Sequence, residues 1–129
     1  MPNDRAQTFA DQLQQLETSG DVAAFVAAVF AGGAELHRPE SQQHMSGGDG
    51  ATTFWTQYLA QFDSIRSEFS RVTDSGDLGV LEWTSTGRLR GGADLTYRGV
   101  SILDFGPDGQ VTRFATYYDT TPFHAAPVG

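Results

Sequence analysis

The last quarter of the chain contains two strand-like runs joined by a tight-turn sequence. The turn, residues 106–109, reads Gly-Pro-Asp-Gly, and these residue types supply the backbone dihedrals that a β-hairpin requires. The second run ends in Tyr117, Tyr118 and Asp119, which places aromatic rings and a carboxylate at a strand end. Residues 97–119 therefore predict a long hairpin that closes the chain. Because the chain begins with helical patterns, such a hairpin leaves few possible architectures.

Apolar residues recur at helical spacing in the first half of the chain and predict three helices. The first helix begins near residue 4 and ends at Gly20, a residue type favoured just past a helix end. Asp21 caps the second helix, which ends at the glycine pair 32–33. Asp49 caps the third helix, which carries several aromatic side chains.

The segments between and after these helices have extended patterns. Residues 34–37 predict a short strand, and residues 40–50 predict a polar, glycine-rich loop. Residues 65–73 and 79–89 predict two further strands, because polar and apolar side chains alternate there. With the closing hairpin, the order is helix, helix, short strand, helix and four antiparallel strands.

Composition limits the protein class. We expect a single domain over residues 1–129, with a flexible tail from about residue 120 to residue 129. The formal net charge is −8, which makes nucleic acid and anionic membranes poor partners. The chain has no cysteine, which excludes disulfides and thiolate metal sites and favours a cytoplasmic location. Neither a signal peptide nor an apolar run of membrane-spanning length is visible in the sequence.

Several short pieces of the sequence, each in order and at matching distances, carry a family resemblance. They are Ser19-Gly20-Asp21, the short strand ending at Pro39, residues 47–55, Leu81-Glu82-Trp83-Thr84 with Gly87, and Asp108-Gly109-Gln110-Val111 through Tyr117-Tyr118-Asp119. The whole chain resembles the SnoaL-like branch of the nuclear transport factor 2 superfamily, which also includes ketosteroid isomerases and limonene-type epoxide hydrolases. The resemblance implies an α+β, cone-shaped fold, with three N-terminal helices packed on a curved, mainly antiparallel sheet around a pocket.

The active site of the ketosteroid isomerases does not carry over to this chain. The resemblance places Leu13, Arg38 and Ser101 where those enzymes have a tyrosine, a carboxylate base and an aspartic acid. A leucine cannot donate a hydrogen bond, and an arginine cannot accept a proton at neutral pH. Arg38 could neutralise an acidic group of a ligand, but we expect it to be a solvated surface residue or a partner of Glu35 or Glu40.

The acids of the cyclases and epoxide hydrolases are also missing. Counting five residues from Val111 gives Thr116 at the aspartate position of the last strand. Trp83 and Ser85 stand where the hydrolases have an arginine and an aspartate on the middle strand. Asp119 matches an aspartate common at this place in the family, and we expect it to bond backbone amides or an arginine.

Aromatic and hydroxyl side chains take the pocket-facing positions that the resemblance implies. The expected substrate-binding residues are Trp83, Ser85, Tyr97, Ser101, Phe114, Thr116 and Tyr118. Such a lining suits a small hydrophobic or aromatic molecule held by one or two hydrogen bonds. The alternative is that the larger of these rings fill a core and leave no pocket.

His37 is the candidate catalytic group, because a histidine can accept a proton near neutral pH. Glu35 lies two residues away and would orient its ring. The alternative is that Leu36 points inward, which would place both polar side chains outside. We expect no metal site, since His37, His44 and His124 have no recurrent ligand spacing.

Three functions remain open at this stage. The first is a cofactor-independent enzyme for isomerisation, cyclisation or hydration of a hydrophobic or aromatic metabolite. The second is a module that binds such a molecule without converting it. The third is a dimerisation module, and we expect a homodimer through the sheet face opposite the pocket. The residues of that face are Val80, Thr84, Val100 and Ile102.

Overall fold

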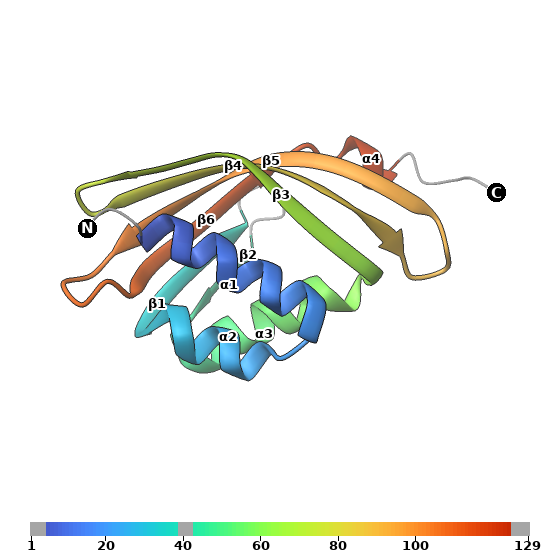
Figure 1. Ribbon diagram of the computed structural model, residues 1–129. Helices are drawn as coiled ribbons and strands as arrows, with labels where there is room; N and C mark the ends of the chain where they lie inside the picture. Colours follow the sequence, from blue (N-terminus) through green and yellow to red (C-terminus); the bar gives the residue numbers. More distant parts are fainter. Residues whose placement is uncertain (1–4, 39–42, 125–129) are drawn as a thin grey trace.

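The computed structural model describes residues 5–38 and 43–124, which form helices packed on one face of a six-stranded sheet (Figure 1). The helices and strands are α1 (Arg5–Ser19), α2 (Val22–Val29), β1 (Phe30–Arg38), β2 (Gln43–Ser46), α3 (Gly47–Ala60), β3 (Phe62–Ser75), β4 (Leu78–Leu89), β5 (Asp94–Phe105), β6 (Val111–Tyr118) and α4 (Thr121–His124). The α+β architecture predicted from the sequence is confirmed.

The sheet has the strand order β2-β1-β6-β5-β4-β3. All neighbouring strands are antiparallel except β1 and β6, which are parallel. The long strands β3, β4 and β5 arch over α1 and α3, so the concave face of the sheet looks towards the helices (Figure 1). This pairing brings β1, from the first third of the chain, beside the last strand.

Aromatic rings from the helices and from β6 form the centre of the core. Phe9 on α1 stacks on Phe114 on β6 at 5.6 Å between ring centroids, and it forms a T-shaped contact with Phe25 on α2. Trp55 on α3 lies 5.3 Å from the same Phe114 ring. Burying each such side chain contributes on the order of 2–3 kcal/mol to folding. These contacts hold α1, α2 and α3 together against β6.

The second helix ends earlier than its glycine pair suggested. It stops at Val29, and Phe30 already has extended dihedrals (φ −101°, ψ 140°). The glycines at 32 and 33 lie within β1, where the register against β6 shifts between Phe30 and Glu35. Glycine is common both at irregular positions in strands and at helix ends. The sequence alone therefore did not show whether this glycine pair ends the helix or lies in a strand.

The predicted loop at residues 40–50 contains regular structure. Residues 43–46 form β2, which pairs antiparallel with β1, and α3 begins directly afterwards at Gly47. Gly47 has a positive φ of 79°, a conformation that other residues adopt only with strain. Asp49 lies in the first turn of α3, and the residue before the helix is Ser46. Residues 39–42 lie outside the described part of the chain.

The predicted tail begins with a short helix. Phe123 on α4 packs against Tyr97 on β5, with ring centroids 4.7 Å apart, and against Tyr118 at 5.7 Å. Burial of these aromatic surfaces explains why the chain continues in an ordered form after β6. The rest of the predicted tail, residues 125–129, lies outside the described residues.

The side chains expected in a dimer interface alternate away from the helices. Val80, Thr84, Val100 and Ile102 are half-buried within a single chain. Burial within one chain does not reveal a partner, so the homodimer stays a prediction. Among the helices of the described chain, none has the length and apolar character needed to cross a membrane.

Gly99→Ala is expected to destabilise the protein because β5 passes close to a packed wall at this residue. A Cβ atom at position 99 would lie 2.6 Å from Cζ2 of Trp83 and 2.7 Å from Cβ of Tyr118. Overpacking of this kind costs about 1–3 kcal/mol. Urea unfolding should show this loss of stability. As a control, the added Cβ of Gly32→Ala meets nothing within 4 Å, so the free energy of unfolding of that variant should stay within about 0.5 kcal/mol of wild type. Equal stability of both variants would contradict the packing at Gly99.

Candidate functional site

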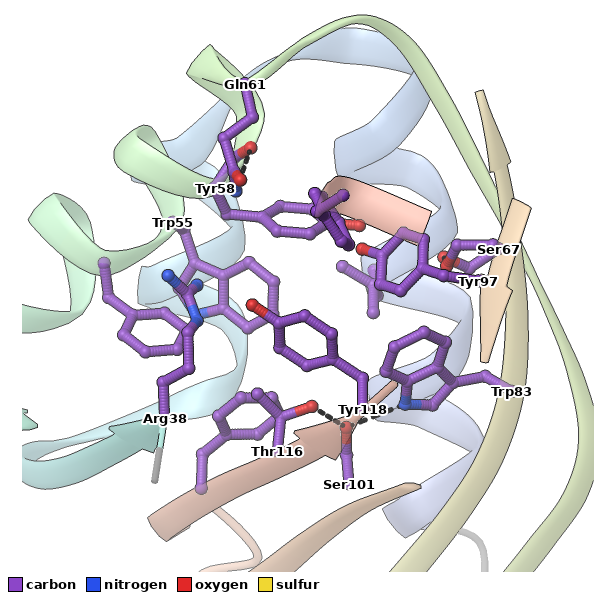
Figure 2. Close-up of a pocket in the computed structure, with 15 residues that line it drawn as sticks. Arg38, Trp55, Tyr58, Gln61, Ser67, Trp83, Tyr97, Ser101, Thr116 and Tyr118 are labelled. Atoms are coloured by element: carbon purple, nitrogen blue, oxygen red, sulfur yellow. Dashed lines mark hydrogen bonds between the residues drawn. The ribbon is translucent and has the colours of Figure 1, made fainter. Parts of the chain in front are cut away.

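A cavity of about 40 Å³ lies between the concave face of the sheet and helices α1, α3 and α4 (Figure 2). Its wall is aromatic on most sides, with hydroxyl groups and one guanidinium. The lining residues are Leu13, Arg38, Phe54, Trp55, Tyr58, Gln61, Ser67, Trp83, Ser85, Tyr97, Ser101, Phe114, Thr116, Tyr118 and Phe123. All seven residues expected to bind substrate are in this wall, and their role in binding stays a prediction. Sequence reasoning missed the lining residues on α3 and β3.

Two hydroxyls and an indole form a buried network on one side of the cavity. Ser101 on β5 and Thr116 on β6 are directly opposite in the sheet, and their oxygens lie 2.9 Å apart. The Trp83 indole donates to the Ser101 oxygen at 3.0 Å (Figure 2). The resemblance implies acids at the positions of Ser101 and Thr116, whereas neutral hydrogen bonds hold this part of the wall here. A neutral wall positions a ligand but supplies no base.

A second polar network connects the cavity to a carboxylate on α1. The Glu17 carboxylate accepts hydrogen bonds from the Ser67 amide at 2.7 Å and from the Ser67 hydroxyl at 2.6 Å. The Ser67 hydroxyl also lies 2.6 Å from that of Ser85, its opposite neighbour on β4. Tyr58 on α3 donates to the same carboxylate at 3.4 Å. Hydrogen bonds to a charged group each contribute about 1.5–3 kcal/mol, so Glu17 also fastens α1 to β3.

Glu17 is half-buried behind the hydroxyls that line the cavity. Burial raises the pKa of its carboxyl above the ordinary value of 4.5, and the hydrogen bonds from Ser67 and Tyr58 oppose that rise. A carboxyl with a raised pKa can gain and lose a proton closer to neutral pH than an exposed one. Helical spacing could have indicated this residue, since Glu17 lies one turn after Leu13 on the buried side of α1.

Tyr58, which donates to this carboxylate, and Tyr97 both line the cavity. Figure 2 shows their hydroxyl groups facing one another, and the two tyrosines affect one another's pKa. Burial raises the pKa of Tyr58 and of Tyr97 well above the usual 10.0, so both are neutral donors at physiological pH. Glu17, Tyr58 and Tyr97 therefore form a continuous chain of exchangeable protons from α1 to the cavity.

Arg38 differs from the sequence expectation of a solvated residue. Its side chain points inward from β1 and is only 9% exposed, with the guanidinium carbon 4.5 Å above the Phe54 ring. Figure 2 shows the Tyr118 hydroxyl pointing to the same side of the cavity. A cation–π contact of this kind contributes about 1–2 kcal/mol when it is shielded from water. Arg38 is the one charged side chain lining the cavity among the described residues.

His37 and Glu35 do not face the cavity, which corrects the catalytic assignment. Leu36 is fully buried, and strand alternation places its two neighbours on the other face of β1. The His37 side chain is 24% exposed, lies 3.3 Å from the Glu35 carboxylate and stacks on the His44 ring. The alternative in which Leu36 points inward is the observed one.

Asp119 has a local structural role at the end of β6. Its carboxylate accepts a hydrogen bond from the Thr121 amide at 3.0 Å, which lowers its pKa and confirms the expected bond to backbone.

The indole N–H of Trp55 is buried and has no hydrogen-bond acceptor among residues 5–38 and 43–124. An unsatisfied buried donor costs about 1–3 kcal/mol. A ligand oxygen that reached this N–H would recover part of that cost.

Comparison with known proteins identifies the family. The family model for the SnoaL-like domain matches residues 9–114. The chain therefore belongs to the SnoaL-like domain family, whose fold is found in cyclase and isomerase members. Among curated proteins, none matches the chain.

Solved structures confirm the fold. A candidate SnoaL-like polyketide cyclase from Jannaschia sp. CCS1 has a TM-score of 0.85 at 18% identity, covering 99% of this chain and 97% of its own. A hypothetical protein with a ketosteroid isomerase-like fold from Catenulispora acidiphila, in complex with trimethylamine, has a TM-score of 0.79 at 15% identity. The match covers 91% of this chain and 89% of the other. An LEH-like epoxide hydrolase from M. tuberculosis has a TM-score of 0.76 at 14% identity, and the match covers 97% of this chain and 90% of the other. At these identities the likeness shows the fold alone.

Glu17→Gln tests the environment of this carboxyl through the pH dependence of stability. Because the pKa of Glu17 is higher in the folded protein than its ordinary value of 4.5, the unfolded chain releases this proton first as pH rises. The free energy of unfolding of the wild-type protein should therefore fall as pH rises from 4.5 to the folded-state pKa of Glu17. The loss is about 1.4 kcal/mol for each unit by which the pKa is raised.

Urea unfolding at a series of pH values measures this difference. The Glu17→Gln curve should decline less than the wild-type curve over the same range. Glu68→Gln makes the same charge change at an exposed residue of β3 and should follow wild type. Parallel curves for wild type and Glu17→Gln would show that the folded environment does not raise this pKa.

Proposed function

We propose that this protein is a cofactor-independent acid–base enzyme of the SnoaL-like type, acting on a small aromatic or hydrophobic molecule with a carbonyl or carboxylate oxygen. The observation that carries the proposal is the hydrogen bond from Tyr58 to the Glu17 carboxylate, with the Tyr97 hydroxyl facing that of Tyr58 in the cavity wall (Figure 2). Such a chain moves a proton between ligand and carboxylate without exposing the ligand to water.

Proton abstraction from a carbon beside a carbonyl is the reaction that this geometry supports best. The ligand C–H bond breaks, the Tyr58 oxygen accepts the proton, and the tyrosine's own hydroxyl proton passes to Glu17. The electron pair of the broken bond moves onto the carbonyl oxygen and forms an enolate. Return of the proton to another carbon gives isomerisation, and attack of the enolate on a second carbonyl gives cyclisation.

The negative charge that develops on the enolate oxygen needs stabilisation by other residues of the cavity. Tyr97 is neutral and donates a hydrogen bond, and Arg38 adds a positive charge in a shielded site. Preorganised donors at a developing oxyanion typically contribute about 2.7–4 kcal/mol to lowering the barrier. The same positive charge disfavours an amine cation such as trimethylamine, the ligand of the Catenulispora relative.

The size of the cavity favours a small ligand. Its volume of about 40 Å³ is far below the roughly 300–1,000 Å³ of pockets for drug-sized molecules. A single aromatic ring enters when half-buried Phe123, on the four-residue helix α4, moves outward. The aromatic walls then stack on the ring, and the polar end of the ligand faces Arg38.

Binding without conversion is the second candidate function. It is favoured by one observation: among the described residues, no carboxylate or imidazole lines the cavity directly. In that case Glu17 only fastens α1 to β3, and the cavity holds a ligand that leaves unchanged. The two candidates differ in whether Glu17 affects turnover or only stability.

Exchange of the methyl protons of acetophenone in D₂O, followed by NMR, separates the two candidates. Wild-type protein should accelerate the exchange above the buffer rate. Glu17→Gln and Tyr58→Phe should each lower kcat by roughly 10²-fold or more while changing KM little, because they act in the proton transfer rather than in binding. Glu17→Gln should also remove the part of the pH profile that reports a carboxyl with a raised pKa.

Matched controls keep this test specific. Tyr117→Phe makes the same change on an exposed tyrosine outside the cavity, and Glu68→Gln repeats the loss of a carboxylate; both should retain wild-type exchange. Exchange at the buffer rate, together with stabilisation by benzoate that is recovered unchanged, would favour the binding module. Wild-type exchange in Glu17→Gln would rule out the proton relay.

A further inference from the structure

Glu35, His37 and His44 form a cluster on the face of the sheet opposite Leu36, outside the cavity. His37 on β1 and His44 on β2 are direct cross-strand partners, so their side chains emerge from the same face. Their rings are stacked with centroids 4.5 Å apart and an interplanar angle of 11°. Glu35 lies two residues before His37 on the same strand and therefore on the same face.

The ligand atoms of the three side chains converge on one point. The Glu35 carboxylate oxygen Oε1 lies 3.3 Å from Nε2 of His37 and 3.9 Å from Nε2 of His44. All three potential ligand atoms lie within 4.8 Å of one another. Ligand atoms of a tetrahedral Zn²⁺ ion, bound at about 2.0–2.1 Å, are roughly 3.3 Å apart. The exposed His44 and Glu35 side chains reach this spacing by small rotations.

We propose that Glu35, His37 and His44 bind a divalent first-row transition metal ion, for which Zn²⁺ is the natural probe. Two imidazoles and one carboxylate are a donor set that suits such ions and is poor for Mg²⁺, which prefers oxygen ligands. Because the cluster is at the surface, a fourth coordination position is open to water or to a group from another molecule. The site is separate from the proposed proton relay.

Metal binding at this cluster would add a link between β1 and β2, which already contact one another through backbone pairing and the stacked histidine rings. β2 is four residues long and leads directly into α3, whose Trp55 and Tyr58 line the cavity. An ion that binds the folded chain and not the unfolded chain raises the melting temperature with ion concentration. The metal therefore stabilises the segment that positions the α3 wall of the cavity.

Calorimetric titration of the full chain, prepared without a histidine tag, with ZnCl₂ tests the site. Wild-type protein should bind a single Zn²⁺ ion per chain, and its melting temperature should rise. His37→Ala, His44→Ala and Glu35→Gln should each lower Zn²⁺ affinity by about tenfold or more and remove the thermal shift. All three residues are half-buried or exposed, and circular dichroism verifies that each variant is folded.

Two controls define the site. His124→Ala removes the third histidine of the sequence, which is not one of the proposed ligands, and should keep wild-type Zn²⁺ affinity. MgCl₂ should produce neither binding heat nor a thermal shift. The proposal is overturned if wild type shows no Zn²⁺ binding at a roughly tenfold molar excess. It is also overturned if the cluster variants retain wild-type affinity, or if His124→Ala alone loses it.

Discussion

The parallel pairing of β1 with β6 is the constraint on which both candidate sites depend. Leu36 is opposite Phe114 and His37 is opposite Ala115, and this register fixes which β1 side chains point towards the helices. A shift by one residue would exchange the two faces of the strand. It would expose fully buried Leu36 and bury His37 in its place. The aromatic packing around Phe114 makes such a shift unfavourable.

The same register places the residues of the two candidate sites on opposite faces of β1. On the inner face, Arg38 brings a positive charge into an aromatic cavity. On the outer face, Glu35 and His37 meet His44 of the neighbouring strand. The inner face is low in water, so each hydrogen bond and charge there has a larger effect than at the surface. The proposed acid–base chemistry therefore lies on the inner face and the proposed metal site on the outer one.

Much of the fold followed from local patterns in the sequence. The closing hairpin, the order of the helices and the inward alternation of Trp83 and Ser85 all depend on neighbours along the chain, which periodicity records. The orientation of β1 did not follow, because residues 34–37 alternate in a way that suits either face. Only the register against β6, more than seventy residues later, distinguishes the two. The polar strand β2 was missed because its composition is that of a loop.

The candidate site shows a similar division. The cavity-wall residues on β4, β5 and β6 were predicted by alternation and by the family resemblance, whereas Ser67 on β3 and Arg38 on β1 were not. Glu17 was missed because it lies on a helix and reaches the cavity only through Ser67 and Tyr58. The pairing of His37 with His44 was missed for the same reason, since a spacing of seven residues has no meaning until β1 and β2 are paired. Contacts between elements, rather than patterns within them, define both sites.

A crystal structure of the protein with sodium benzoate tests the central claim most directly, because benzoate combines one aromatic ring with an acidic oxygen pair. The expected result is benzoate in the cavity, with its carboxylate against Arg38 and within hydrogen-bond distance of Tyr97, and its ring among the aromatic walls. Density for benzoate outside the cavity, or a cavity without benzoate at saturating concentration, would contradict the assignment of the inner face as the functional site.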